Sequence, residues 1–174
     1  MAMRKIILSF AMSLDGCMAE ETGALEWLHR TVARETQPPF LQLVDTVVLD
    51  WNAYYRIATE LSPGEWADPE IRSYVLTDRR LRETGRITFR NQDPAELLSE
   101  LKQQEGGCIW VFGGTDLVRR LLEKGLFDEL VVTVVPRLLG KGSRLFDPLG
   151  SRRRLKLLST WEEQDLVDLH YEVL

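Results

Sequence analysis

The spacing of apolar residues changes partway along residues 109–125. Residues 109–112 form a short apolar run of the kind found in a buried strand. Beyond Gly114 the apolar residues recur with the spacing of one face of a helix, at Leu117, Val118, Leu121 and Leu122. Gly125 follows the last of them and is well placed to end that helix. The pattern therefore predicts a strand that leads directly into a helix.

A glycine pair, Gly113 and Gly114, joins these two predicted elements. Backbone at such a pair can pass close to a ligand, and the unpaired N–H groups of the helix's first turn point toward it. An anion such as a pyrophosphate suits this position. The pair is less than the full dinucleotide-binding fingerprint, however, and a tight connection without any ligand explains it equally well.

Strand and helix patterns alternate along the chain up to residue 124. Further strands are predicted at residues 5–11, 46–49, 73–77 and 86–90, with helices that start near Pro38 and Pro94. Beyond residue 125 the pattern is strand only, at residues 128–135, 154–161 and 166–174. This order favours an α/β fold with a mostly parallel sheet covered by helices and antiparallel strands added at its C-terminal end.

Residues suited to ligand binding follow four of the predicted strands. They are Asp15, Gly16, Asp50, Trp51, Thr77, Asp78, Arg79, Gly113, Gly114 and Thr115. Ligands of such sheets bind outside the carboxyl ends of the strands, so the pattern predicts one cleft at that edge. Taken alone, the group around Asp15 is also explained as a turn.

Three other side chains have simpler explanations. Trp27 lies in an amphipathic segment and either packs in the core or lines a pocket. His29 is expected at the surface. In the last predicted strand Asp168, His170 and Glu172 share the face opposite the apolar residues, so His170 is also expected at the surface.

Composition narrows the function classes. The 174 residues suffice for one domain, residues 1–174, and are too few for two comfortable ones. A net charge of -5 argues against a nucleic acid or an anionic membrane as the main partner. The start of the chain lacks a signal-peptide pattern and no apolar run is long enough to span a membrane, so a cytoplasmic protein is expected. Cys17 and Cys108 have no metal-ligand spacing, and no metal site is predicted.

Four segments resemble the dihydrofolate-reductase-like superfamily, within the branch that contains the reductase domain of the bifunctional riboflavin-biosynthesis deaminase/reductase. They are residues 11–16 (Ala-Met-Ser-Leu-Asp-Gly), 111–114 (Val-Phe-Gly-Gly), 125–130 (Gly-Leu-Phe-Asp-Glu-Leu) and 136–142 (Pro-Arg-Leu-Leu-Gly-Lys-Gly). Glu26 and Trp27 also look like the Asp/Glu-Trp segment of stand-alone members. The resemblance covers nearly the whole chain and implies a three-layer α/β/α fold with a mixed, mostly parallel sheet, often in a homodimer.

The resemblance also implies an NADPH-dependent reductase of a C=N or C=O bond in a pterin-like or ribosylamino-pyrimidine substrate. The implied cofactor contacts are Ala11, Gly16, Asp50, Trp51, Thr77, Asp78, Arg79, Gly113, Gly114, Thr115, Asp116 and Leu117. The implied substrate contacts are Trp27 and Phe112. Asp15 or Glu26 is the candidate proton donor, on condition that a dry pocket raises its pKa.

One segment departs from the family pattern. Family members usually have Gly-Arg-x-Thr after the second strand, whereas this chain has Asp50, Trp51, Asn52 and Ala53. A carboxylate beside a pyrophosphate costs about 1 kcal/mol in water and more where water is excluded. The departure supports a second hypothesis, a non-catalytic ligand-binding or dimeric scaffold protein that keeps the fold without NADPH. It also allows a third, a different nucleotide or a cofactor without phosphate.

Overall fold

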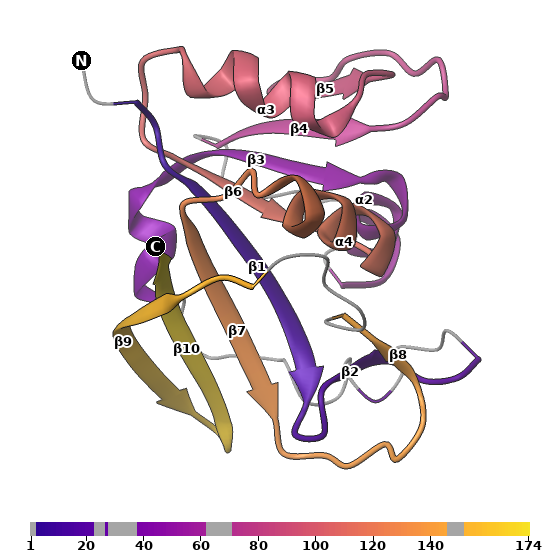
Figure 1. The fold of residues 1–174 in the computed structure, drawn as a ribbon. Helices are drawn as coiled ribbons and strands as arrows, with labels where there is room; N and C mark the ends of the chain where they lie inside the picture. Colours follow the sequence, from indigo (N-terminus) through magenta and orange to yellow (C-terminus); the bar gives the residue numbers. More distant parts are fainter. Residues whose placement is uncertain (1–2, 23–26, 28–37, 62–70, 146–151) are drawn as a thin grey trace.

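The computed structural model describes residues 3–22, 27, 38–61, 71–145 and 152–174. A single large sheet lies at its centre (Figure 1). Its strands in chain order are β1 (Ile6–Ser13), β3 (Val44–Asp50), β4 (Arg72–Leu76), β5 (Ile87–Arg90), β6 (Cys108–Phe112), β7 (Glu129–Val135), β9 (Leu155–Glu163) and β10 (Leu166–Val173). Their order across the sheet is β5-β4-β3-β6-β1-β7-β10-β9.

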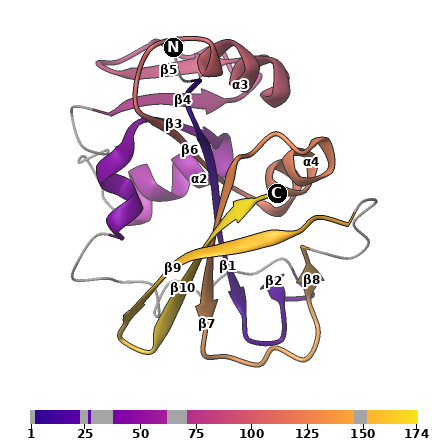
Figure 2. The same cartoon turned by 60° about the vertical axis from the view of Figure 1, so that its left-hand side comes forward.

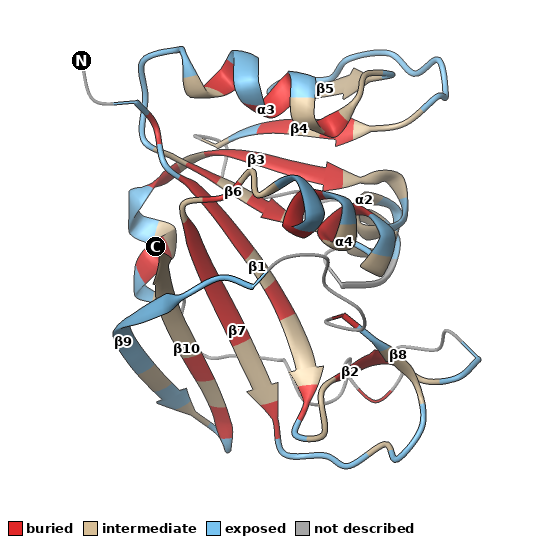
Figure 3. Cartoon of the chain, in the orientation of Figure 1, coloured by how far each residue is buried: buried red, intermediate tan, exposed pale blue. Residues whose placement is uncertain are grey.

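The strands from β5 through β7 are parallel, and the last two are not. β10 pairs antiparallel with β7, and β9 pairs antiparallel with β10. The prediction of a mostly parallel sheet with antiparallel C-terminal strands is therefore confirmed. Central strands such as β1 are buried along most of their length (Figure 3), which explains why they read as continuous apolar runs in the sequence.

Helices cover both faces of the sheet. They are η1 (Pro39–Leu43), α2 (Trp51–Arg56), η2 (Ile57–Leu61), α3 (Pro94–Lys102) and α4 (Thr115–Lys124). α3 and α4 pack with Ile6, Leu8 and Phe10 of β1 in one core cluster, while α2 packs with Val47 and Leu49 of β3 in another. Figure 2 shows α2 and α4 on opposite sides of the sheet. The result is the expected three-layer arrangement.

The helix ends follow from local sequence. The Asp93 carboxylate accepts a hydrogen bond from the N–H of Ala95 at 2.8 Å, and Pro94 occupies the first position of α3. α4 ends at Gly125, whose φ of 65° is left-handed, as predicted from the sequence. The helix predicted near Pro38 exists as the short 3-10 helix η1, which buries Phe40.

A second, two-stranded sheet was not predicted. It pairs β2 (Cys17–Ala19) with β8 (Ser143–Arg144), and strands of three and two residues are too short to show alternation. At Gly142 a Cβ would overlap the backbone carbonyl oxygen of Ala19, so glycine is required for this close approach. The small sheet brings residues 139–144 beside the loop that follows β1 (Figure 1).

Candidate functional site

The strands β4, β3, β6 and β1 are adjacent and parallel, so they end at one edge of the sheet. We call the residues that follow these four strands the carboxyl edge. The arrowheads of β3, β4 and β6 point to the same side in Figure 1. The expectation that the candidate residues gather at one edge thus agrees with the sheet order, which places the end of β3 directly beside that of β6.

Asp50 connects two helix starts at this edge. It is the last residue of β3 and caps α2, where its Oδ1 accepts a hydrogen bond from the N–H of Ala53 at 2.8 Å. Its Oδ2 accepts a second hydrogen bond from the N–H of Gly114 at 2.5 Å. Gly114 is the N-cap residue of α4. The carboxylate therefore lies at the position where an anion would approach the start of α4.

The glycine pair is explained by this carboxylate. A Cβ at Gly113 would lie 2.5 Å from Oδ2 of Asp50 and 3.0 Å from Cδ2 of Leu117. A Cβ at Gly114 would lie 3.2 Å from the same oxygen. Glycine is therefore required at these positions because the Asp50 side chain approaches the backbone closely. With Asp50 in this place the residues do not fit a pyrophosphate at the start of α4.

Arg79 and Trp51 meet at the same edge. The Arg79 guanidinium carbon lies 4.7 Å from the centre of the Trp51 ring, and the Thr77 hydroxyl accepts a hydrogen bond from the N–H of Arg79 at 3.2 Å. The Trp51 ring also contacts Tyr54, at 5.6 Å between ring centres. Such a cation–π contact at an exposed position contributes about 0.5–1 kcal/mol. The predicted cofactor contacts Thr77, Arg79 and Trp51 therefore lie together, with Asp78 exposed beside them.

Asp15 holds two loops together. Its carboxylate accepts hydrogen bonds from the Ser13 hydroxyl at 2.6 Å, from the N–H of Leu139 at 3.1 Å and from the N–H of Gly140 at 2.7 Å. These hydrogen bonds lower the pKa of Asp15 to about 2, the Ser13 hydroxyl having the largest effect. A lowered pKa favours the carboxylate form over a proton donor. Asp15 is a carboxylate near neutral pH, and Gly16 beside it takes a left-handed φ of 83°.

The Asp15 contact should weaken in acid. Because its pKa of about 2 lies below the ordinary 3.8, the carboxylate stabilises the folded loops fully above about pH 4, and this contribution falls as the pH drops toward 2. NMR titration of the Asp15 carboxyl carbon should give a midpoint near 2. Asp15→Asn should speed hydrogen exchange at the Gly140 amide. A midpoint at 3.8 or higher would contradict this assignment.

The predicted substrate contacts are less open than expected. Trp27 is 7 % exposed and packs against Val135 and Leu166, with Ala11 at the border of this cluster. Phe112 contacts Trp110, at 4.4 Å between the centres of two tilted rings, on the α2 side of the sheet. Glu26 lies outside the described residues, as does His29.

The first turn of α4 holds the remaining predicted cofactor contacts. Thr115 and Asp116 are the first two residues of this helix, and the Asp116 side chain is exposed. The Leu117 side chain is buried in the core. The cofactor contact predicted for Leu117 therefore concerns its backbone N–H alone.

His170, on the polar face of β10, is only partly exposed, so it is not the surface residue that was predicted. His170 Nε2 lies 2.7 Å from Oε2 of Glu129, and its side chain is 16 % exposed. Asp168 is 4 % exposed and accepts a hydrogen bond from the Thr133 hydroxyl at 2.6 Å. β10 lies inside the sheet, and its neighbours β7 and β9 flank its edges. Its polar face is covered in part by Phe40 of η1, whose ring centre lies 6.3 Å from that of His170, and the pattern of a single strand does not reveal such a neighbour.

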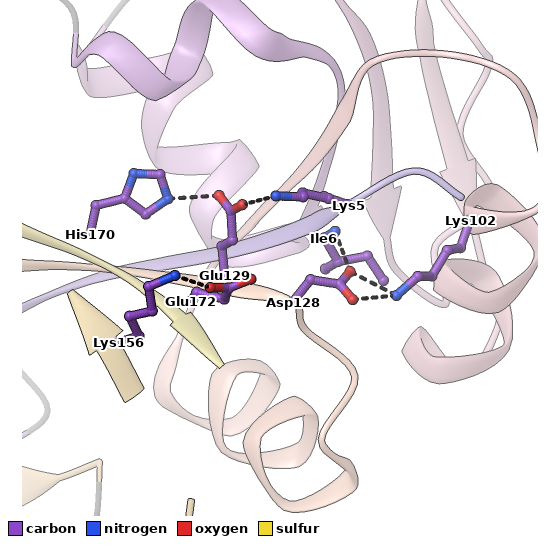
Figure 4. A network of polar contacts seen from close by, with 8 residues as sticks. All are labelled: Lys5, Ile6, Lys102, Asp128, Glu129, Lys156, His170 and Glu172. Carbon is purple, nitrogen blue, oxygen red and sulfur yellow. Dashed lines mark hydrogen bonds and ion pairs between the residues drawn. The ribbon is translucent and has the colours of Figure 1, made fainter. Parts of the chain in front are cut away.

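Figure 4 shows His170 in a network that lies at the other end of the sheet. Glu129 binds both His170 and Lys5, the latter at 2.6 Å, and this hydrogen bond raises the pKa of Lys5. Beside it, the Asp128 carboxylate binds Lys102 and the N–H of Ile6. Ile6 and Glu129 begin their strands, so the network belongs to the amino ends and not to the carboxyl edge.

No group of three or more His, Cys, Asp or Glu side chains in the described ranges could hold a metal ion. Within the same ranges, no helix is long and apolar enough to cross a membrane.

Comparisons with known proteins agree with this geometry. Residues 4–167 match the family model of the RibD C-terminal domain. The chain is 33 % identical to the uncharacterized protein YwjB of Bacillus subtilis over 171 residues, which cover 97 % of each chain. It superposes on the crystal structure of a putative riboflavin biosynthesis protein from Shewanella sp. PV-4 with a TM-score of 0.75, 22 % identity and coverage of 98 % and 99 %.

A larger enzyme shares the same fold. The structure of a deaminase/5-amino-6-(5-phosphoribosylamino)uracil reductase from Thermotoga maritima matches with a TM-score of 0.66 at 13 % identity, over 98 % of this chain and 56 % of that one. At this identity the match bears on the fold alone. Together with the family match, it confirms the dihydrofolate-reductase-like architecture expected from the sequence. The chain therefore belongs to the RibD C-terminal domain family.

Proposed function

We propose that this protein is a reductase of a small nitrogen heterocycle, of the pterin-like or ribosylamino-pyrimidine class, and that it binds this substrate at the carboxyl edge. Membership of a family with reductase-like structural neighbours supports the reaction class. The observation that carries the location is the sheet order, which brings the ends of β4, β3, β6 and β1 side by side. Loops at such an edge are where α/β sheets bind ligands.

Reduction needs a hydride and a proton, and NADPH is the hydride donor that the family implies. Under this proposal Ala11 and Gly16 border the nicotinamide, and Thr77, Asp78 and Arg79 border the adenosine end. The start of α4 does not fit the pyrophosphate while Asp50 binds Gly114. Of the two candidate proton donors, Glu26 is favoured over Asp15, because hydrogen bonds lower the pKa of Asp15. Trp27 and Phe112 remain the proposed substrate contacts.

The reductase proposal is tested by turnover. The purified protein is mixed with millimolar NADPH or NADH and a panel of pterins and ribosylamino-pyrimidines, and the loss of nicotinamide absorbance is followed. We expect oxidation that depends on one heterocycle and is absent without it. If neither nucleotide is oxidised with any member of the panel, the reductase proposal fails.

One observation favours the second candidate, a non-catalytic ligand-binding protein. The Asp50 carboxylate takes the N–H of Gly114, as expected of a chain that has lost its cofactor. The two candidates are separated by mass spectrometry of any ligand that stays bound to the protein during native purification. A stoichiometric ligand other than a nicotinamide nucleotide, combined with no turnover, would establish this candidate.

We also propose a homodimer through the edge strand β9. Leu155, Leu157 and Leu158 are 43–51 % exposed on this strand, which is coloured as exposed along much of its length in Figure 3. An apolar edge strand is a ready pairing surface. Light scattering should give twice the mass of the chain, and Leu157→Lys should shift it toward the monomer. A monomer at all concentrations would contradict the proposal.

A further inference from the structure

The start of α4 already holds an anion that belongs to the chain. Oδ2 of Asp50 lies 2.5 Å from the N–H of Gly114, and Oδ1 lies 2.8 Å from the N–H of Ala53. Both oxygens are therefore used by backbone donors from two different helices. The ten-residue α4 has its positive end at this carboxylate.

The Asp50 carboxylate is also closely packed against its neighbours. At Gly113 a Cβ would stand 2.5 Å from Oδ2 of Asp50, so the carboxylate lies directly against the backbone of the glycine pair. Leu117 closes the other side, because its Cδ2 would stand 3.0 Å from the same Cβ. A phosphate oxygen that approached the N–H of Gly114 would meet the Asp50 oxygen in the position it needs.

The charged residues Asp116 and Arg79 do not offset the repulsion between Asp50 and an incoming phosphate. Asp116, in the first turn of α4, adds a second exposed carboxylate. The nearby cation Arg79 lies over the Trp51 ring, 4.7 Å from its centre. An incoming phosphate at the start of α4 would therefore meet two carboxylates, those of Asp50 and Asp116.

We propose that Asp50 is a specificity-determining residue that stands in for a phosphate, so that the ligand of the carboxyl edge presents no phosphate at the start of α4. The ligand class that fits is a heterocycle without a phosphate at this point, or a cofactor without a diphosphate there. The inference rests on the proposed function only in that the carboxyl edge is the ligand site. It predicts weak affinity for pyrophosphate and NADPH in the native protein.

Replacing Asp50 tests this directly. Asp50→Ser keeps a hydroxyl that can cap α2 but removes the charge and frees the N–H of Gly114. Asp50→Asn removes the charge at nearly constant volume. Glu123→Gln is the matched control, because it removes an exposed carboxylate from the far end of α4. Binding of pyrophosphate and of NADPH is measured by calorimetry and by tryptophan fluorescence, and folding by circular dichroism.

Asp50→Ser should bind both probes at least about tenfold more tightly than the native protein, because a like charge next to the phosphate is gone. Asp50→Asn should gain less, since its amide still fills the space, and Glu123→Gln should not change. Equal affinity in the native protein and Asp50→Ser overturns the proposal. If Asp50→Ser does not fold, Asp50→Asn decides: no gain overturns the proposal.

This outcome is separate from the reductase proposal. The measurement needs no substrate and no turnover, so an inactive protein whose Asp50→Ser variant gains phosphate affinity supports the inference while the reductase proposal fails. Turnover by a native protein that binds NADPH as tightly as Asp50→Ser supports the reductase and overturns the inference.

Discussion

Replacing Arg4 by alanine is expected to lower the free energy of unfolding by about 3 kcal/mol, because its guanidinium is buried and each partner would lose a donor. The side chain is 1 % exposed and donates to the Gly107 carbonyl at 2.7 Å, to the Thr46 hydroxyl at 2.7 Å and to the Asp45 carboxylate. These contacts tie the start of β1 to the starts of β3 and β6. Asp45 is 35 % exposed, which places the estimate at the lower end of the range for buried pairs.

The control uses the same acidic partner. Arg72 lies 3.9 Å from the other oxygen of Asp45, but its side chain is 44 % exposed. Arg72→Ala should cost less than about 1 kcal/mol. Thermal unfolding should show a fall in Tm of roughly 6–12 °C for Arg4→Ala and little change for Arg72→Ala. Equal losses in the two variants would show that the burial of Arg4 is not what matters.

Trp27→Ala is expected to have an effect of similar size, about 3–5 kcal/mol, through the cavity it leaves. The ring is 7 % exposed, and Val135 and Leu166 beside it are fully buried. Trp27→Phe fills most of the cavity and should cost only about 1 kcal/mol. Denaturant unfolding measures both, with an unchanged slope if the change lies in the folded state. A loss below about 1 kcal/mol for Trp27→Ala would mean that the ring is not a core residue.

The two Trp27 variants also separate packing from substrate contact. An unstable Trp27→Ala protein loses activity for reasons unrelated to the substrate. Trp27→Phe keeps the fold, so a rise in KM with little change in kcat in that variant would identify a substrate contact.

Much of the fold could be predicted because the signals are local. Gly125 ends α4 in the left-handed conformation, and Asp93 with Pro94 starts α3, as their sequence positions indicate. The buried parallel strands read as apolar runs, and the change to a strand-only pattern after Gly125 predicts the antiparallel addition. The carboxyl edge followed from these elements, because parallel strands that are joined by helices end on the same side.

The missed features depend on residues far apart in the chain. The hydrogen bond between Asp50 and Gly114 joins positions 64 residues apart, and the sequence showed a carboxylate and a glycine pair without their contact. The sequence indicates that Asp15 is a turn residue or an acid, whereas the structure shows that it accepts hydrogen bonds from the N–H groups of Leu139 and Gly140. The partly exposed His170 is bound by Glu129 from another strand. In each case the long-range partner decides the chemistry.

The most direct test of the account is a ¹H–¹⁵N NMR titration with NADPH, on the native protein and on Asp50→Ser. In the native protein we expect any perturbed amides to lie in the loops after β1 and β4, with the Gly114 amide unmoved because Asp50 holds it. In Asp50→Ser the Gly114 and Thr115 amides should move. A strong, saturating shift of Gly114 in the native protein would contradict the role of Asp50. Shifts around Glu129 instead would contradict the location of the site.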